Sequence, residues 1–248
     1  MLEISKPSHN RPMIATIFGN AGLGKTSLAA SFPKPIFIRT EDGTQSLAGM
    51  DVALFPVATT SQMVFDNIKA LFENEHDFET LVIDSITQLN VIIENEVIES
   101  DAKAKNIMTA GGGYGAGYSM VAAVHQKIRE WCGHLSTQKN MNIVFIGHAD
   151  TETITPPDSE DYTRYTMRLH KKSISHYADN VDLVGFLKLQ TFTTSKGDKA
   201  KATSTNVRLL TCHPVASHIS KNRYGISEDV VFELGNNPLS KFLTNKGK

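Results

Sequence analysis

Residues 19–26 have the residue types and the spacing of a loop that wraps a polyphosphate. They fit the pattern G-x-x-x-x-G-K-[ST] at every position, after an apolar run and before a helical stretch. Glycines in such a loop let main-chain N–H groups turn inward, and the following helix N-terminus adds partial positive charge. Lys25 is expected to reach the β- and γ-phosphates of ATP, and Thr26 to ligate Mg²⁺. A glycine turn without a ligand is the alternative. The predicted nucleotide-binding residues are Gly19, Asn20, Ala21, Gly22, Leu23, Gly24, Lys25, Thr26 and Ser27.

Three polar side chains follow predicted strands and add catalytic and metal-binding candidates. Asp84 ends one apolar run, where it can hold the water shell of Mg²⁺ together with Thr26, or simply cap the next helix. Glu41 can polarise a water for attack on a phosphate, with Asp42 as a substitute, unless the two only form an acidic turn. His148 can sense the terminal phosphate, or be a hydrogen-bonded surface residue.

The elements that must position these residues alternate along the chain. Apolar runs predict buried strands and helical spacing predicts helices, so we expect a mostly parallel sheet covered on both faces. Ser61 is a plausible N-cap. The segment 111–117 has five glycines in seven residues and is not expected to form a regular element. The expected strands are 13–18, 35–38, 53–55, 80–84 and 142–146, and the expected helices are 26–32, 61–72, 86–98 and 118–135.

From about residue 181 the pattern changes to strands with little helix between them. The polar, lysine-bearing stretch 194–204 predicts an exposed hairpin tip between two of these strands. We expect antiparallel strands that extend the sheet, not a second domain. The strands expected here are 181–189, 206–211 and 230–234, and the expected division of the chain is an N-terminal extension (1–11), one domain (12–235) and a flexible tail (236–248).

Composition and charge limit the class of protein. The 248 residues are 40% hydrophobic and 21% charged, which fits one globular α/β domain. No apolar run is long enough for a membrane helix and no signal core is present, so we expect a cytoplasmic protein without a membrane partner. Cys132 and Cys212 suit a reducing compartment, and nothing requires a disulfide between them.

The net charge of −1 hides an asymmetry along the chain. Residues 1–124 carry 8 basic and 14 acidic side chains, a sum of −6, whereas residues 125–248 carry 17 and 12, a sum of +5. A basic half indicates either a polyanionic partner or scattered solvated lysines.

Together these residues resemble the ATPase core of RecA-like proteins over about residues 12–234. The shared order is the phosphate-binding loop, a glutamate after the second strand, Asp84-Ser85 ending an apolar strand, and a polar residue ending a later strand. The resemblance implies a RecA-like P-loop NTPase core, with Glu41 activating water and His148 sensing phosphate. RecA-like recombinases usually have glutamine where His148 stands. The histidine, the short chain and the missing N-terminal domain resemble minimal phage proteins of the Sak type, which are linked to single-strand annealing and would act in a bacterial host cell.

The RecA-like resemblance also implies two mobile loops that bind single-stranded DNA, at about 101–118 and 149–166. The first contains Lys103, Lys105 and the glycine-rich segment with Tyr114 and Tyr118, whose rings could stack on bases. In the second, residues 149–163 carry five acidic side chains and no Lys or Arg, which repels phosphate. The acidic part could face a neighbouring subunit. The basic residues that follow it are Arg164, Arg168, Lys171 and Lys172.

Lys221-Asn222-Arg223 resembles the K-x-R element of hexameric helicases of the DnaB type. There the two cations reach the nucleotide of the adjacent subunit, for which the planar fork of arginine is well suited. Arg223 is therefore the candidate arginine finger and Lys221 its companion. The alternative is a basic turn before a strand. The resemblance implies a ring or filament of identical subunits with ATP and Mg²⁺ at their interfaces.

Four functions are compatible with this pattern. The leading hypothesis is an ATPase that binds single-stranded DNA and promotes annealing or strand pairing in phage-type recombination, with a single-strand-binding protein as a candidate partner. A replicative helicase or helicase-loading motor is the alternative that the K-x-R element supports. A small-molecule P-loop kinase would need a lid and an acceptor site, against which the antiparallel C-terminal section argues. A nucleotide-switch scaffold without turnover is the fourth.

Overall fold

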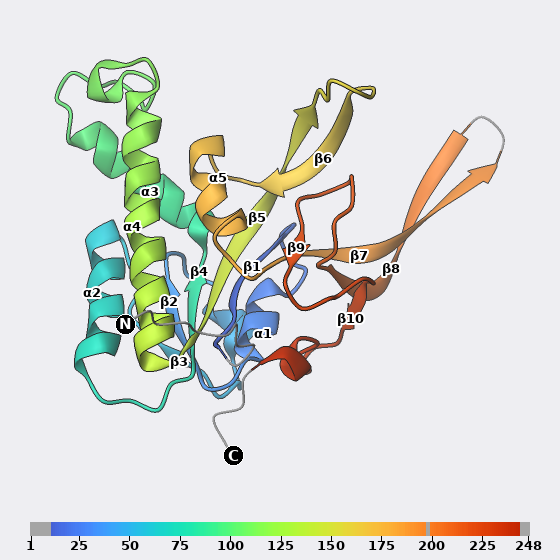
Figure 1. Ribbon diagram of the computed structural model, residues 1–248, viewed down its shortest axis with the longest axis horizontal. Coiled ribbons are helices and arrows are strands. Elements are labelled where there is room, and N and C mark those ends of the chain that lie inside the picture. Colours follow the sequence, from blue (N-terminus) through green and yellow to red (C-terminus); the bar gives the residue numbers. More distant parts are fainter. Residues whose placement is uncertain (1–10, 197–198, 244–248) are drawn as a thin grey trace, which may run out of the picture.

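The computed structural model describes residues 11–196 and 199–243. Its centre is a sheet of ten strands in the order β10-β8-β7-β1-β5-β4-β2-β3, with β6 paired to β5 and β9 to β7 (Figure 1). The strands from β7 to β3 in this order are parallel, and the pairs of β8, β9 and β10 are antiparallel. This arrangement confirms the expected fold class, an α/β P-loop NTPase fold with a mostly parallel sheet and antiparallel C-terminal strands.

Three of the parallel strands, β1, β2 and β4, are short and almost entirely buried, as the apolar runs predicted. All six parallel strands begin within two residues of their expected starts, whereas β5 and β7 continue beyond their expected ends. The strands are β1 (Ile14–Gly19), β2 (Pro35–Arg39), β3 (Ala53–Leu54), β4 (Thr80–Asp84), β5 (Asn142–Ile154), β6 (Tyr162–Met167), β7 (Leu183–Lys196), β8 (Lys199–Thr211), β9 (Lys221–Asn222) and β10 (Val230–Phe232).

The helices lie on both faces of the sheet, and the residue that caps one of them differs from the expectation. Thr60 caps α2, because its side chain accepts a hydrogen bond from Met63 N; Ser61 is the first helical residue instead. The helices are α1 (Lys25–Ala30), α2 (Ser61–Glu73), α3 (Ile86–Glu99), α4 (Ala116–Lys139) and α5 (Lys171–Ala178), with the 3₁₀ turns η1 (Thr44–Leu47), η2 (Ala110–Gly112) and η3 (Ser240–Phe242).

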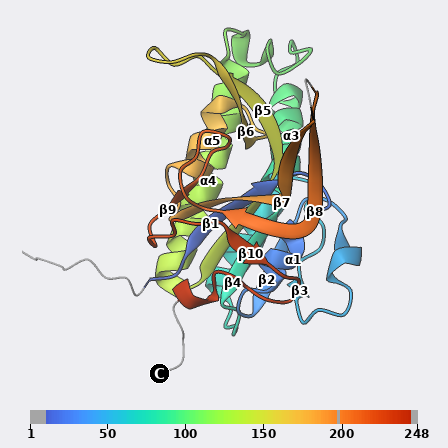
Figure 2. The same cartoon turned by 90° about the vertical axis from the view of Figure 1, so that its right-hand side faces the viewer.

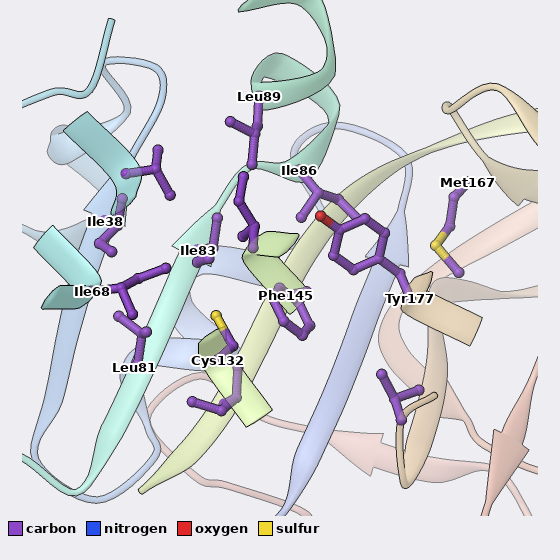
Figure 3. Packing of buried hydrophobic residues seen from close by; sticks show 14 of the residues in the cluster. Ile38, Ile68, Leu81, Ile83, Ile86, Leu89, Cys132, Phe145, Met167 and Tyr177 are labelled. Atoms are coloured by element: carbon purple, nitrogen blue, oxygen red, sulfur yellow. The ribbon is translucent and has the colours of Figure 1, made fainter. Parts of the chain in front are cut away.

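Two apolar clusters hold the helices on the sheet, one on each face. Successive strand residues point to opposite faces, so Ile36 and Ile38 join one cluster while Phe37 joins the other. The larger cluster packs α2, α3, α4 and α5 onto the sheet, and Figure 3 shows Phe145 and Tyr177 within it. The smaller cluster packs α1 and the C-terminal segment onto the other face. Figure 2 shows the fold turned by 90° from Figure 1.

The segment expected to be a mobile loop, 149–166, is a β-hairpin instead. β5 runs on to Ile154 and pairs antiparallel with β6 from Ala149–Met167 to Ile154–Tyr162. The expectation of a loop was wrong because this stretch is polar and half exposed, so its pairing rests on main-chain hydrogen bonds that no apolar pattern reveals. Helix α5 was also not expected, since its sequence is mostly polar and its buried residues include Ser173.

The C-terminal strands form the long hairpin that the sequence predicted. β7 and β8 pair from Phe186–Thr211 out to Lys196–Lys199, with a register shift between Leu189 and Thr191. Figure 1 shows this hairpin and the β5–β6 hairpin both extending well beyond the helical layer.

The end of the described chain is packed, so the expected flexible tail does not hold for residues 237–243. Leu239 is fully buried in the smaller cluster, and Asn237 donates a hydrogen bond to Ser31 O. The rest of the expected tail, 244–248, and nearly all of the expected N-terminal extension lie outside the described residues. Among the described residues, no helix is long and apolar enough to span a bilayer.

Candidate active site

The register of four neighbouring strands brings the predicted site residues to one edge of the sheet. Gly19 at the end of β1 pairs with His148 on β5, and Asp84 at the end of β4 lies between Ile146 of β5 and Arg39 of β2. Glu41 follows β2 by two residues. Because parallel strands end together, the phosphate-binding loop, both carboxylates and the histidine converge at the carboxyl edge, where ligands bind in open α/β sheets.

The loop between β1 and α1 has the backbone geometry of a phosphate cradle. Gly22 and Gly24 have φ angles of 77° and 89°, a left-handed conformation that glycine adopts without a Cβ clash. Gly24 is also the N-cap of α1, and no side chain caps this helix. The cradle is held from outside, since Arg208 Nε on β8 donates to Leu23 O at 3.0 Å.

Lys25 lies inside this cradle and is 6% exposed. Its ammonium group donates to Gly19 O at 3.1 Å and to Asn20 O at 2.9 Å, two carbonyls of the loop itself. Burial lowers the pKa of Lys25, while the nearby charges of Asp84 and Glu41 counteract the shift. A buried ammonium with only carbonyl partners is suited to receiving phosphate oxygens, so the cradle fits the triphosphate of ATP.

Thr26 and Asp84 form the pair expected to hold Mg²⁺. Thr26 Oγ1 donates to Asp84 Oδ2 at 2.7 Å, across the gap between α1 and β4. Burial raises the pKa of the Asp84 carboxyl, and the hydrogen bond from Thr26 opposes that shift. A hydroxyl and a carboxylate are the hard oxygen ligands that Mg²⁺ prefers, so the donor set fits this ion. The neighbouring Ser85 caps α3 by accepting from Gln88 N.

Glu41 and His148 face each other across the site. His148 Nε2 lies 3.4 Å from Glu41 Oε1, and the main chain of His148 is fixed by a hydrogen bond from its N–H to Thr87 Oγ1. The hydrogen bond with His148 is the largest cause that holds the pKa of Glu41 below its usual value. Glu41 is therefore an ionised proton acceptor at neutral pH, and its side chain is 44% exposed and open to water. Asp42 instead pairs with Arg39 at 3.6 Å.

Arg168 joins the site, although no sequence pattern placed it there. It lines a cavity of about 330 Å³ together with Asn20, Glu41 and His148. Its N–H donates to His148 O at 2.8 Å, and its guanidinium donates to Ala149 O at 3.1 Å. The positive charge of Arg168 also contributes to the lowered pKa of Lys25. Only the unexpected pairing of β5 with β6 brings this residue, twenty positions after His148, back to the phosphate site.

Lys221 and Arg223 lie at the opposite, amino edge of the sheet and not in their own protomer's site. Lys221 Nζ donates to Asp179 O at 2.6 Å. Arg223 Nη1 donates to Asp182 Oδ1 at 2.8 Å, and Arg11 pairs with the same carboxylate, which also accepts from Ile14 N. Any role of these cations at a neighbour's nucleotide stays a prediction, and it requires Arg223 to leave a carboxylate that is 5% exposed.

The glycine-rich segment contains one free aromatic side chain and one that is engaged. Tyr114, at a positive φ of 50°, is fully exposed. Tyr118 instead stacks on His170 with ring centroids 4.0 Å apart. Lys172 anchors the end of the segment by donating to Ser119 Oγ at 2.7 Å and to Gly115 O at 3.3 Å. The segment forms the turn η2 and then α4, which begins at Ala116 and so includes Gly117 of the expected irregular stretch.

Other chemistry is not supported by the side chains that the structure describes. Among them, no group of three or more His, Cys, Asp and Glu could hold a metal ion. Cys132 and Cys212 are free and buried in different apolar clusters, and burial raises the pKa of each thiol to about 12. Both are therefore inert core residues.

Comparison with known proteins agrees with this geometry. A family model described as an AAA domain matches residues 11–224, most of the chain, including the cradle and every other residue of the site. The search of curated proteins found no match.

Proposed function

This chain belongs to the AAA domain family of nucleotide-hydrolysing ATPases, and we propose that it uses ATP to bind single-stranded DNA and promote annealing in phage-type recombination. The observation that carries the ATPase part is the buried Lys25 inside the cradle, beside the Thr26–Asp84 pair and the ionised Glu41. The DNA part is supported by the charge asymmetry along the sequence and by the resemblance of the motif order to RecA-like proteins.

Each residue of the site has a separate task in this proposal. When bound, ATP supplies the scissile phosphate and Mg²⁺ offsets its charge. Lys25 and the loop N–H groups grip the phosphates, while Thr26 and Asp84 provide the oxygens for the ion. Glu41 accepts the proton of the attacking water, and His148 keeps that carboxylate ionised and oriented.

Arg168 supplies a second cation to the site from the same protomer. Its guanidinium lines the cavity that also contains Glu41 and His148, on the side of the cradle where the terminal phosphate would lie. An arginine there can stabilise charge that develops during phosphoryl transfer, because its rigid fork presents parallel N–H donors. We therefore expect basal hydrolysis without a neighbouring subunit, and assembly into a ring or filament to modulate it.

The single strand would bind on the same edge of the sheet as the nucleotide. The fully exposed Tyr114 is the candidate stacking side chain of the glycine-rich segment, whereas Tyr118 is already stacked on His170. The basic C-terminal half, with its sum of +5, provides attraction for the phosphate backbone. Because His148 starts the β5–β6 hairpin and Arg168 follows it, a change at the phosphate site can be transmitted to that hairpin.

The most direct test is the ATPase rate as a function of protein concentration, with and without single-stranded DNA. We expect Mg²⁺-dependent hydrolysis that rises on addition of the strand, and an assembly whose size also depends on it. Indifference of both hydrolysis and assembly size to DNA would remove the DNA part of the proposal.

A matched variant tests the nucleotide part separately. Lys25→Ala removes the ammonium group from the cradle and should abolish uptake of a labelled adenine nucleotide in the presence of Mg²⁺. Equal and negligible uptake by the wild-type protein would remove the ATPase proposal altogether. Glu41→Gln should retain nucleotide binding and lose turnover, and full turnover in this variant would favour a nucleotide switch.

The helicase alternative depends on Lys221 and Arg223. In this structure both are engaged with groups of their own protomer, so no contact favours it over annealing. Directional unwinding of a partial duplex by the purified protein would decide for it.

A further inference from the structure

A second cavity, larger than the catalytic one, opens on the other side of the phosphate cradle. It encloses about 690 Å³, within the range of ligand-binding pockets. Its walls come from the cradle, from β6, from residues 186–192 of β7, from Ser204 and Leu209 of β8, from Asp229, and from the loop at Ser217 and His218. Asn20 lines both this cavity and the catalytic one. Both hairpins therefore contribute to the cavity, through β6 and through β7 and β8.

One wall of the cavity is a row of aromatic rings. Tyr165 stacks on Phe186 with ring centroids 5.0 Å apart, and Phe186 lies against His218 at 4.5 Å. Phe186 and His218 are buried, whereas Tyr165 is 38% exposed. Tyr165 therefore ends the row and can offer ring surface to an incoming flat ligand.

The position of Tyr165 is fixed by its main chain. Its N–H donates to Ser217 O at 2.8 Å, and its carbonyl accepts from Ile219 N at 3.1 Å. The ring is therefore held at the cavity by a strand paired on one side with β5 and on the other with the 217–219 loop. Such preorganisation reduces the entropic cost of stacking.

The polar groups of the cavity suit a neutral ligand better than an anion. Lys188 is paired with Asp229 at 3.1 Å, so its charge is compensated. Gln190 adds an amide, and His218, which is 2% exposed, has no hydrogen-bond partner for Nε2 among the described residues. Burial lowers the pKa of His218 to about 4, so the ring is neutral at physiological pH. A phosphate group would therefore meet no uncompensated cation among the described residues that line this cavity, whereas a heterocycle with donors and acceptors on its edge needs none.

We propose that this cavity binds an unpaired nucleobase of a single strand, with Tyr165 as its stacking platform. The proposal rests on the DNA-binding function proposed above and names the site where a base is read. The strand is favoured as the source of the base because the cavity is lined by β6, β7 and β8, which belong to the two hairpins that extend well beyond the helical layer (Figure 1). These hairpins offer an extended polymer more surface than a single nucleotide needs.

The floor of the cavity is connected to the cradle through main-chain contacts. Leu187 lines the cavity and pairs with Gly19, the first residue of the cradle. A Cβ atom on Gly19 would lie 2.3 Å from Leu187 O, so the two backbones are in direct contact. A base bound in the cavity would contact Leu187, which packs directly against the first residue of the cradle. This contact gives a physical route by which DNA binding can alter hydrolysis.

The first arm of the test compares two ligands and needs no variant. Anisotropy is measured with a labelled oligothymidylate and with an abasic strand of the same length and charge, in the presence of a non-hydrolysable ATP analogue. We expect the abasic strand to bind roughly tenfold more weakly, because it keeps the backbone and loses base stacking. Equal affinity for the two strands would overturn the proposal, and no binding of either strand would overturn the DNA-binding function itself.

The second arm assigns the effect to this cavity. Tyr165→Ala should lower affinity for oligothymidylate roughly tenfold and leave the abasic strand unaffected, while Tyr165→Phe, which keeps the ring, should bind both as the wild type does. Retained affinity for a labelled adenine nucleotide shows that Tyr165→Ala is folded and that its cradle is intact. If nucleotide affinity falls and strand affinity does not, the cavity holds the base of ATP, which overturns the assignment to a strand.

Discussion

At the scale of single residues, Glu41 and His148 act as one unit. The hydrogen bond between them lowers the pKa of Glu41 in the folded protein, so it stabilises the ionised carboxylate. That contribution to folding stability is present above the ordinary pKa of glutamate and is lost as the pH falls through the lowered value.

Replacing His148 should therefore change the pH profile of hydrolysis. In His148→Ala the pKa of Glu41 rises towards its ordinary value, so the acid limb of the profile should move to higher pH. His148→Gln keeps a donor and should restore the wild-type limb. The measurement is turnover at saturating ATP across the acidic range, and an unmoved limb in His148→Ala would contradict the role given to this pair.

Thr26 gives a second prediction at this scale. Thr26→Ala removes the hydroxyl that donates to Asp84, leaving a largely buried carboxylate with one partner fewer. We expect at least a roughly tenfold rise in the Mg²⁺ concentration needed for half-maximal hydrolysis. Thr26→Ser retains the hydroxyl and is the matched control. An unchanged Mg²⁺ requirement in Thr26→Ala would show that the ion is held elsewhere.

The sequence was sufficient to find the residues that stand directly after strands. The cradle, Glu41, Asp84 and His148 converge because parallel strands end at one edge, a rule that needs no coordinates. Arg168 could not be found in this way. Its place depends on the β5–β6 hairpin. The residues of this hairpin are mostly polar and partly exposed, so no alternation of apolar and polar residues marks its strands.

At the scale of elements, the contact between β1 and β7 sets the space available to the cradle. Gly19→Ala would force a Cβ atom against the carbonyl of Leu187, and backbone atoms cannot rotate away as a side chain can. We expect the free energy of unfolding to fall by about 1–3 kcal/mol, and nucleotide affinity to fall as well.

The matched control is Gly133→Ala within α4. A Cβ there would lie 3.0 Å from Arg129 Nη1, the flexible end of a side chain, so alanine should be neutral or stabilise the helix by up to about 1 kcal/mol. Urea denaturation of both variants compares the two sites. A Gly19→Ala protein as stable as the wild type would show that β7 can move away from the cradle.

Elements with a strong apolar pattern were predictable, and those held by hydrogen bonds or by polar helix faces were not. β1, β2 and β4 are buried on both faces, so their sequences are continuous apolar runs. Helix α5 is only eight residues long and buries Ser173 beside Tyr177 and Ala178, so its apolar stripe is short and is interrupted by a polar residue. The β7–β8 hairpin was found because its tip is polar while its base is buried.

At the scale of the whole molecule, the two candidate cations predict different responses to protein concentration. Arg168 lies in its own protomer's site, so Arg168→Ala should lower turnover at every concentration, at least roughly tenfold. Arg223 lies at the opposite edge of the sheet, so Arg223→Lys, which keeps a positive charge beside the buried Asp182 and loses the planar fork, should affect turnover only where copies assemble.

ATPase rates across a dilution series, with sedimentation to record the assembly, check this difference. Lys69→Ala, which removes one exposed positive charge from α2, controls for net charge. Loss of turnover in Arg223→Lys at the lowest concentration, or normal turnover in Arg168→Ala, would contradict the division of roles.

The carboxylate of Asp182 has a consequence for how far this molecule can be shortened. Two arginines far apart in the sequence, Arg11 and Arg223, form ion pairs with this one carboxylate, which is almost completely shielded from solvent. A fragment that starts after the first arginine or stops before the second leaves an anion in the interior with half its compensation, a costly state. The smallest autonomous folding unit must therefore retain both arginines, in addition to the buried residues that follow the second one, such as Phe232 and Leu239.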